Sequence, residues 1–264
     1  MNVAIKTPAQ IEGIRRSCRL AAQALKFIEP HVVAGAVTAE LDKLLEHFIF
    51  SHGAVPATLG YRGFPKASCI SVNDVICHGI PGDLVLKDGD ILNIDVTTIL
   101  DGYYGDTSTM FAVGEVSETA KKLMRVTKEC LDIGVRNVKP GGYVGTIGYW
   151  ISQHAKNNGF TVVEEFSGHG VGLQFHEGLL IPHFGKRYTG EQLRPGMVFT
   201  IEPMINAGRK EIKELGDGWT IVTKDHSLSA QWEHTVVVTE TGYEVLTLSA
   251  GSPAIPDFIT QKTA

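Results

Sequence analysis

The strongest constraint on the fold is that one half of the chain weakly repeats the other. A turn-and-helix pattern that begins at Gly35 returns 106 residues later, and a glycine turn before an apolar strand recurs at Gly89 and Gly196, 107 residues apart. The repeated strands carry acids, because Asp95 and Glu202 are also 107 residues apart. A nearly fixed offset over several elements indicates a duplicated unit. The simplest architecture is therefore a doubled scaffold whose acids converge between the halves.

We expect the duplication to form a single domain of the mixed α/β (α+β) class, in which helices flank a mainly antiparallel sheet. The 264 residues are enough to bury a sizeable core. The predicted halves span about 1–115 and 116–250. The remaining residues, 251–264, contain Ser and Pro with little periodicity, and we expect them to form a short tail on the surface.

Apolar residues at helical spacing, together with capping signals, predict three long helices. Thr7 and Pro8 begin a capping box, and the helix that follows is expected to end near Pro30. Thr38 and Ser117 are the predicted caps of the second and third helices.

The stretch from Ile91 to Asp106 combines a buried strand with two carboxylates. Asp101-Gly102 is a hairpin turn signal, and Asp95 and Asp106 lie at similar distances from it on the two arms. One hairpin can therefore direct both acids toward the same place. Like charges at one place require a metal ion or a shared proton, whereas a lone buried aspartate can instead be satisfied by backbone N–H groups.

A glycine-rich segment and two further acids extend this pattern into the second half. Ser167–Gly172 holds three glycines around His169, which implies a backbone that passes close to another group. Glu202 is the counterpart of Asp95, and Glu233 precedes an apolar strand as the returning acid of the hairpin does. Four carboxylates and one imidazole suit two divalent ions of the Mn, Fe, Co or Zn type better than a closed structural zinc site. Two such ions can activate water for the hydrolysis of a peptide or an ester.

Composition argues against several other classes of function. A net charge of −5 and an isoelectric point near 6.1 give no electrostatic case for specific nucleic-acid binding. The sequence has no apolar stretch long enough to span a bilayer and no export signal, so we expect a cytoplasmic protein without membrane contacts. The four cysteines show no CxxC spacing and are expected to be free thiols.

Six segments of the chain form longer motifs. They are Cys77–Pro81 (CHGIP), Asn93–Thr97 (NIDVT), Gly105–Ser108 (GDTS), Gly168–Gly172 (GHGVG), Thr200–Met204 (TIEPM) and Gln231–Thr235 (QWEHT). In this combination and order, the chain resembles type I methionine aminopeptidases of the bacterial, extension-free kind, and the likeness covers nearly its whole length. The resemblance implies the pseudo-twofold pita-bread fold and a single catalytic domain. It also implies removal of the initiator methionine from nascent polypeptides and from peptides with N-terminal methionine, with a preference for a small second residue.

By this resemblance, five residues would hold two divalent metal ions. They are Asp95, Asp106, His169, Glu202 and Glu233. Asp106 and Glu233 match the positions that bridge the two ions. Asp95 matches a ligand of one ion, and His169 and Glu202 match ligands of the other. The ligand set does not decide between Co, Mn, Fe and Zn.

Three residues match positions with catalytic roles in the family. His78 and His176 match two active-site histidines, whose imidazoles can hydrogen-bond the substrate and stabilise the tetrahedral intermediate. Glu202, besides its role as a ligand, matches the residue that takes the proton of the attacking water. Without the motifs, each of the two histidines is equally consistent with a hydrogen-bonded histidine of the core or the surface.

A set of apolar residues matches the methionine pocket of the family. It comprises Tyr61, Phe64, Cys69, Phe175 and Trp219. Together they would form an apolar cavity that tolerates sulfur, although without the resemblance such a set is more typical of an ordinary core. Thr58 stands where relatives often carry cysteine, and Phe64 where some carry tyrosine, so the shape of the pocket is expected to differ in detail.

A loop site for one monovalent cation is a further expectation. Asn73, Val75 and Ser229 match positions that hold such an ion in some relatives. Backbone and amide oxygens can bind a monovalent cation, but a plain turn explains the same residues equally well.

Two other functions are alternatives to this one. A prolidase or Xaa-Pro aminopeptidase of the same fold usually has a large extra N-terminal domain, whereas the first predicted helix here begins at about residue 8. A non-catalytic binding protein on this fold would have lost metal ligands, whereas the five here are intact. We expect a monomer, and the sequence leaves open whether it touches the ribosome transiently.

Overall fold

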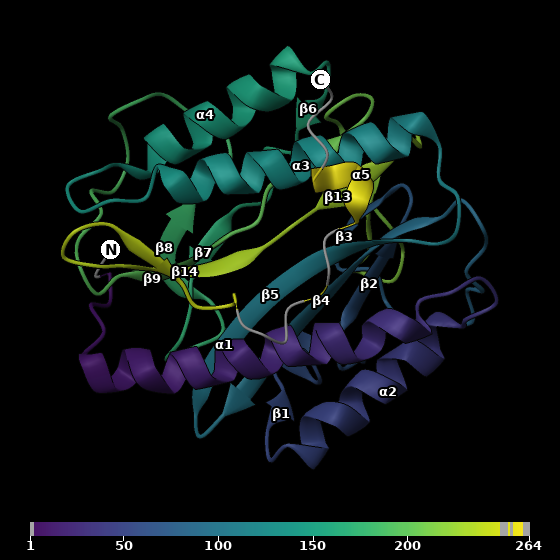
Figure 1. The fold of residues 1–264 in the computed structure, drawn as a ribbon, viewed down its shortest axis with the longest axis horizontal. Coiled ribbons are helices and arrows are strands. Elements are labelled where there is room, and N and C mark those ends of the chain that lie inside the picture. Colours follow the sequence, from purple (N-terminus) through teal and green to yellow (C-terminus); the bar gives the residue numbers. More distant parts are fainter. Residues whose placement is uncertain (1–2, 249–252, 254–255, 261–264) are drawn as a thin grey trace.

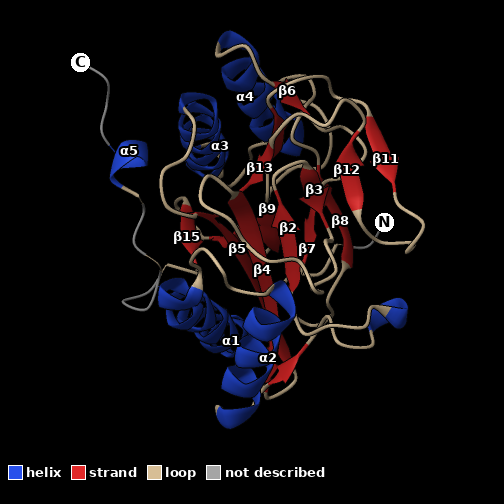
Figure 2. Ribbon diagram, turned by 90° about the vertical axis from the view of Figure 1, so that its right-hand side faces the viewer, coloured by secondary structure: helices blue, strands red, loops and turns tan. Residues whose placement is uncertain are grey.

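The structure is a computed structural model, and it describes residues 3–248, 253 and 256–260. The strands form a central layer with a pair of helices on each side, as Figures 1 and 2 show. Helices α1 (Pro8–Ile28) and α2 (Thr38–Ser51) cover one side of this layer. Helices α3 (Glu118–Arg136) and α4 (Val144–Asn157) cover the other side.

Every strand pair among the described residues is antiparallel, as the predicted fold class requires. One sheet has the order β1 (Val55–Pro56), β4 (Ile91–Leu100), β2 (Cys69–Val72), and β5 (Tyr103–Ala112) pairs with β4. The five-stranded sheet has the order β15 (Tyr243–Val245), β14 (His234–Val238), β9 (Val198–Ile201), β7 (Gly168–Gly170), β8 (Glu177–Ile181). Two smaller sheets have the orders β13 (Ser229–Gln231), β10 (Met204–Asn206), β6 (Thr161–Val162) and β11 (Ile212–Glu214), β12 (Ile221–Thr223), β3 (Val75–Cys77).

The duplication read from the sequence is present in the fold. Helices α2 and α4 are both 14 residues long, and their first residues are 106 positions apart. The residue before each helix makes an isolated antiparallel bridge, Val37 with Val85 and Tyr143 with Gln192. These bridges correspond at offsets of 106 and 107, so the same local packing occurs twice. The boundaries of the two halves, about 1–115 and 116–250, stay a prediction.

The predicted helix starts are confirmed for α1 and α3. The Thr7 hydroxyl accepts a hydrogen bond from the Gln10 backbone N–H at 3.3 Å, and the Gln10 side chain accepts one from the Thr7 N–H at 2.8 Å, which completes the capping box. The Ser117 hydroxyl accepts from the Ala120 N–H at 3.2 Å at the start of α3. Both caps satisfy N–H groups that a helix leaves unpaired at its beginning.

The predicted cap of the second helix is wrong by one residue. Val37 occupies the cap position with an extended backbone, and Thr38 is the first helical residue. The Thr38 hydroxyl donates to the Gly82 carbonyl at 2.9 Å and accepts from the Gly82 N–H at 3.0 Å. Because the loop at residue 82 occupies the hydroxyl, Thr38 does not cap its own helix. A partner 44 residues away decided the position.

The β4–β5 hairpin is formed as predicted. Its turn residues, Asp101 and Gly102, have φ angles of 52° and 81°, which is the left-handed backbone that a two-residue hairpin turn needs. In the register, Asp95 faces Ser108 and Thr97 faces Asp106. Since side chains alternate along a strand, Asp95 and Asp106 lie on the same face as diagonal neighbours.

Helix α1 lies directly against the backbone of β5 at Gly105. A Cβ atom on Gly105 would lie 2.2 Å from the Cys18 backbone nitrogen, so any larger residue would push the helix away from the strand. The core beneath α1 and α2 is built from buried residues between Leu20 and Val113, and a second core under α3 and α4 contains Phe199. The hairpin that carries Asp95 and Asp106 is thus fixed on both sides.

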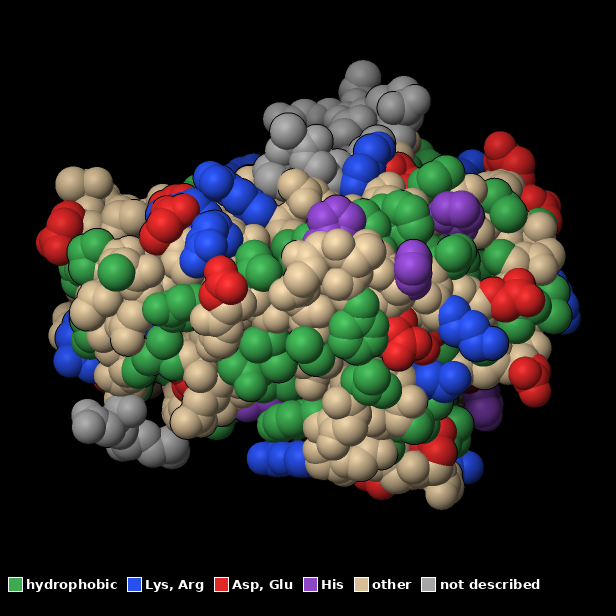
Figure 3. All heavy atoms as spheres, turned by 90° about the horizontal axis from the view of Figure 1, so that it is seen from below, with side chains coloured by type: hydrophobic (Ala, Val, Ile, Leu, Met, Phe, Trp, Pro, Cys, Tyr) green, Lys and Arg blue, Asp and Glu red, His purple; other side chains and the backbone are tan. Residues whose placement is uncertain are grey.

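The surface over α1 and α2, drawn in Figure 3, mixes side chains of both charges with apolar ones. Phe50 and Val55 are among the exposed apolar residues of this half. No helix among the described residues combines the length and the apolar character that crossing a bilayer would require.

Much of the expected surface tail, 251–264, lies outside the described residues. The part that is described includes α5 (Asp257–Thr260), which lies beside α3 in Figure 2. Ile259 is buried in the core beneath α3 and α4, so this turn of helix is packed against the domain.

Candidate active site

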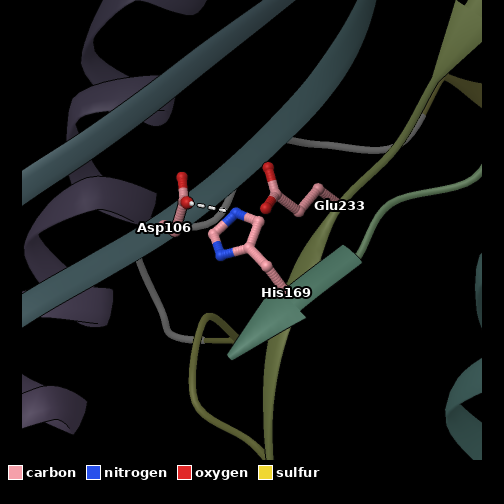
Figure 4. Close-up of side chains that lie close together, drawn as sticks. All are labelled: Asp106, His169 and Glu233. Atoms are coloured by element: carbon pink, nitrogen blue, oxygen red, sulfur yellow. Dashed lines mark ion pairs between the residues drawn. The ribbon is translucent and has the colours of Figure 1, made fainter. Parts of the chain in front are cut away.

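One cavity of about 360 Å³ gathers the residues that the sequence singled out for chemistry. Its lining includes all five candidate metal ligands, Asp95, Asp106, His169, Glu202 and Glu233. Three of them point toward one another in Figure 4. Asp106 lies on β5, His169 lies on β7, and Glu233 lies in the segment that leads into β14. The ligand atoms of Asp106, His169 and Glu233 all lie within 4.8 Å of one another. Both halves of the duplicated fold therefore contribute to the same site.

The orientation of two of the acids is fixed by neighbouring side chains. The Thr97 hydroxyl donates to Asp106 Oδ1 at 2.7 Å. The Thr200 hydroxyl donates to Glu202 Oε1 at 2.7 Å, and the Gln231 amide donates to Glu202 Oε2 at 3.2 Å. Each hydrogen bond also removes rotational freedom from the carboxylate, which keeps it directed into the cavity.

The imidazole of His169 is oriented for metal binding. Its Nδ1 lies 3.1 Å from the Gly170 carbonyl oxygen, which can only accept, so Nδ1 carries the proton in the neutral ring. The unprotonated Nε2 then faces Asp106 Oδ2 and Glu202 Oε1, each at 3.6 Å. A lone pair that faces carboxylates is unfavourable by itself, but it is the arrangement in which imidazole and carboxylates bind one cation.

Burial raises the pKa of all four acids. It is the largest cause in each case, and at Asp95 the charges of Asp106 and Glu202 raise the pKa further. At Glu202 the pKa rises to about 7, because burial outweighs the opposing effects of His169 and the Thr200 hydroxyl. None of the four forms an ion pair with a described Lys or Arg. A bound cation stabilises the charged form of buried acids that lack such partners.

Asp95 gives the clearest sign that a group is needed here. Its Oδ1 atom is buried and has no hydrogen-bond partner among the described residues. Satisfaction by backbone N–H groups, the alternative considered from the sequence, therefore does not account for this oxygen. An orphaned carboxylate oxygen beside three further acids and an imidazole fits divalent metal ions by the chemistry of the donor set.

The two histidines expected to act in catalysis, His78 and His176, line the same cavity. The ring of His176 is 4.1 Å from that of His169, measured between centroids. The ring of His78 lies edge-on to Phe166 at 5.5 Å, and its residue has a φ of 56°, a strained backbone that neighbouring structure must hold. Burial is the main cause that lowers the pKa of His78 to about 4 and that of His176 to about 3, and a positive charge on His169, when that ring is protonated, lowers both further. Both rings are therefore neutral near pH 7.

The five residues expected to form the methionine pocket line the same cavity, with Thr58 beside them. The ring of Tyr61 lies 4.8 Å from that of Phe175, and Phe64 meets Trp219 edge-on at 5.1 Å. Phe64, Cys69 and Phe175 are also buried. Aromatic rings and a thiol therefore line the same cavity as the acids.

The cavity also contains residues that sequence reasoning did not assign. They are Arg62, Glu165, Phe166, Ser167, Glu177, Leu180 and Met204. Phe166 directly precedes the glycine-rich segment, Ser167 is its first residue, and Glu177 directly follows His176, so their place in the sequence was a usable signal. The positions of Arg62 and Glu165 carried no such signal.

His183 was also missed, although it supports a candidate ligand. It is fully buried, and its Nε2 accepts a hydrogen bond from the Glu202 backbone N–H at 3.1 Å. Burial lowers the pKa of His183 to about 3, which keeps the ring neutral and able to accept. It lies 19 residues before Glu202, and nothing in the spacing pointed to the contact.

The expected monovalent-cation loop has ordinary turn contacts. The Asn73 carbonyl accepts from the Ser229 N–H at 2.8 Å. The Asn73 side chain donates to Asp90 at 2.8 Å and accepts from the Ile91 N–H at 3.1 Å. Val75 pairs with Val222 in the adjoining sheet. A turn and the adjoining strand pairing are consistent with these contacts, and the cation site stays a prediction.

Comparisons with known proteins agree with this geometry. The model of metallopeptidase family M24 matches residues 12–240. The methionine aminopeptidase of Escherichia coli K12 is 53% identical over 250 residues, covering 94% of this chain and 95% of its own. Methionine aminopeptidase A of Synechocystis is 54% identical over 240 residues, covering 90% of this chain and 95% of its own. The crystal structure of methionine aminopeptidase from Rickettsia prowazekii matches with a TM-score of 0.92 and 48% identity, over 94% of this chain and all of that one.

Proposed function

This chain belongs to metallopeptidase family M24, and from that premise we propose that it is an aminopeptidase that removes N-terminal methionine from polypeptides. The observation that carries the proposal is the single cavity described above, which joins a cluster of acids and histidines to an aromatic pocket. The high identity to methionine aminopeptidases over nearly the whole chain supports the choice of substrate.

We propose that two divalent ions of the Co, Mn, Fe or Zn type are the cofactors. Asp95, Asp106 and Glu233 would hold one, and His169 and Glu202 would complete the other, with Asp106 and Glu233 shared. When bound, the ions supply a water activated for attack and positive charge for the substrate. The orphaned oxygen of Asp95 and the proton-free Nε2 of His169 support this assignment.

Glu202 is the proposed proton carrier. Both of its carboxylate oxygens accept hydrogen bonds, from Thr200 and from Gln231, and its backbone N–H is bound by His183. A carboxylate with both oxygens held can take the proton of the attacking water and release it to the departing amine without reorienting. His183 contributes by fixing the backbone from which the carboxylate projects.

His78 and His176 are the proposed donors to the substrate. Because their pKa values are lowered to about 4 and about 3, each ring is neutral near pH 7 and keeps one N–H group. An N–H aimed at the carbonyl oxygen of the first peptide bond stabilises the negative charge that develops there. Neutral donors do this without adding charge beside the ligands.

The aromatic part of the cavity lining is the proposed binding site for the methionine side chain. Tyr61, Phe64, Cys69, Phe175 and Trp219 offer apolar surface and aromatic ring edges, which favour a thioether sulfur.

The substrates would be nascent polypeptides in the cytoplasm, and the enzyme would act as a monomer. A transient ribosome contact would follow from such substrates, and the loop at Asn73, Val75 and Ser229 is the place to look for one monovalent cation.

Peptide cleavage by purified protein tests the proposal. The protein is stripped with a chelator, reloaded with Co, Mn, Fe or Zn, and given Met-Ala-Ser, Met-Leu-Ser and Ala-Pro peptides. We expect release of methionine from Met-Ala-Ser, slower release from Met-Leu-Ser, none from Ala-Pro, and no activity without metal. Cleavage of Ala-Pro in preference to Met-Ala-Ser would instead assign the chain to a proline-directed peptidase.

A further inference from the structure

The buried ion pair between Lys6 and Glu177 lies outside the roles assigned so far. Lys6 belongs to the extended segment before α1, and Glu177 is the first residue of β8, 171 positions later in the chain. The side chains of Lys6 and Glu177 are 1% and 10% exposed, respectively, and the Lys6 ammonium donates to Glu177 Oε2. Glu177 also lines the active-site cavity, so the pair connects the beginning of the chain to the site.

Lys6 is held in place by the backbone around it. Its N–H donates to the Gly196 carbonyl at 2.9 Å, and Thr7 next to it caps α1. A Cβ atom on Gly196 would lie 3.0 Å from the Lys6 carbonyl oxygen and 2.8 Å from the Ile5 side chain, so the segment crosses the turn before β9 in close contact. In Figure 1 the N-terminal segment rises from α1 to the region of β8 and β9. The side chain that carries the ammonium group therefore projects from a backbone whose position is fixed.

Glu177 closes the loop that carries His176. Its Oε1 atom accepts a hydrogen bond from the Leu173 N–H at 3.0 Å, while its Oε2 atom accepts from Lys6. Phe175 and His176 lie between the two ends of this closure. Glu177 also pairs with Gly170 across the β7–β8 ladder, directly beside His169. The rotamer of the Glu177 side chain thus determines the positions of both ends of this loop.

The ion pair has a cost that a role in positioning would explain. Burial lowers the pKa of Lys6, and Glu177 is the one carboxylate paired with it among the described residues. Removing two charges from water is often no more favourable than packing apolar side chains of similar volume. A buried ion pair also fixes the orientation of both side chains, because each charged group must keep its geometry to remain hydrogen-bonded to the other.

We propose that Lys6 is a positioning residue of the reaction: through Glu177 it fixes the loop that places the His176 ring against the substrate. This inference rests on the proposed function, because it assumes that His176 acts on the scissile bond. The N-terminal segment is then part of the active-site architecture. Its contribution passes through one side chain to the 173–177 loop and from there to the imidazole.

The first test compares Lys6→Met with wild type, both loaded with metal, on Met-Ala-Ser. Methionine keeps the aliphatic stem and removes the ammonium. We expect kcat to fall about 10- to 100-fold, the range found when an outer partner of an active-site group is lost. KM should change by less than about twofold, because a group that acts in the transition state is affected. The metal content should stay that of wild type.

The matched control is Lys26→Met. Lys26 is also a lysine paired with a glutamate, but its pair with Glu29 lies on the surface at the end of α1. We expect this variant to have the kcat and KM of wild type, because neither residue contacts the 173–177 loop in the structure.

A double-variant comparison separates positioning from a merely structural role. If Lys6 acts through His176, Lys6→Met should reduce kcat by less than about twofold in a His176→Ala background, since the group it positions is already gone. If the two losses multiply, Lys6 acts independently of His176 and the inference is overturned. Full activity of Lys6→Met would overturn it directly.

A second variant covers the case in which Lys6→Met does not fold. Glu177→Gln keeps an oxygen for the Leu173 N–H and the shape of the side chain, but it leaves the ammonium without its counter-charge. The same comparison in the His176→Ala background then decides the question. Failure of the wild-type protein to cleave Met-Ala-Ser would overturn the proposed function itself, whereas active wild type with an equally active Lys6→Met overturns only this inference.

Discussion

Replacing Glu202 with glutamine should make the metal-free protein more stable above pH 7. The pKa of Glu202 rises from 4.5 to about 7 in the folded chain, mainly because of burial. The folded state therefore holds this proton more tightly than the unfolded state, so Glu202 favours folding at low pH. That contribution is lost as the pH rises from 4.5 through 7. Glutamine resembles the protonated acid and has no charge to bury.

The size of the effect follows from the shift. A change of one pKa unit corresponds to about 1.4 kcal/mol, so the shift at Glu202 corresponds to a penalty of about 3 kcal/mol above pH 7. Below pH 4.5 the carboxyl is protonated in both states, and the two proteins should have nearly equal stability. The difference in unfolding free energy between Glu202→Gln and wild type should therefore grow from near zero to about 3 kcal/mol with rising pH.

Urea unfolding in the presence of a chelator, at intervals from pH 4.5 to 8, measures this difference. Three histidines act in the opposite direction, because lowered pKa values at His78, His176 and His183 destabilise the folded state as the pH falls below 6.5. Both proteins share these histidines, so their effect cancels in the comparison. With saturating metal the order should reverse, since binding stabilises the wild type more. A difference that stays flat, or that favours wild type in chelator as the pH rises, would refute the reasoning.

Three further predictions concern ligation, catalysis and packing. Asp106→Ala should remove bound metal and lower cleavage of Met-Ala-Ser by more than about 100-fold, measured by metal analysis and peptide assay; full activity would contradict the ligand assignment. His176→Ala should lower kcat about 100- to 1000-fold with little change in KM, and unchanged turnover would exclude a stabilising role. Gly105→Ala should destabilise the fold by about 1–3 kcal/mol or more, because its Cβ would meet the Cys18 backbone at 2.2 Å, whereas Gly216→Ala, where the Cβ has open space, should leave the melting temperature almost unchanged.

Local rules were sufficient where a feature depends on nearby residues. The Asp101-Gly102 turn fixes the register of its hairpin, and a period of two then places Asp95 and Asp106 on one face. The same holds for the cap at Thr7, whose partner is three residues away. The repeat offset of the sequence also recurs in the structure, because each half makes the same bridge before its second helix.

Local rules failed at Thr38, where the sequence offered a good cap and the structure used the hydroxyl elsewhere. The competing partner is the backbone at Gly82, which only the folded chain brings within hydrogen-bond distance. The same applies to His183, whose contact with the Glu202 backbone depends on how β8 and β9 are placed around β7.

The sequence by itself determined which residues can do the chemistry, because side-chain type, strand alternation and turn geometry are properties of neighbouring residues. It therefore identified the acids, His169 and the doubled scaffold that presents them, whereas His78 and His176 were identified through the family resemblance. Only the tertiary structure decided how those groups are held, through the amide of Gln231 on Glu202 and the ammonium of Lys6 on Glu177. Such contacts join residues that are distant in the chain or follow from the exact path of the backbone. Their energies depend on burial, which no short stretch of sequence contains.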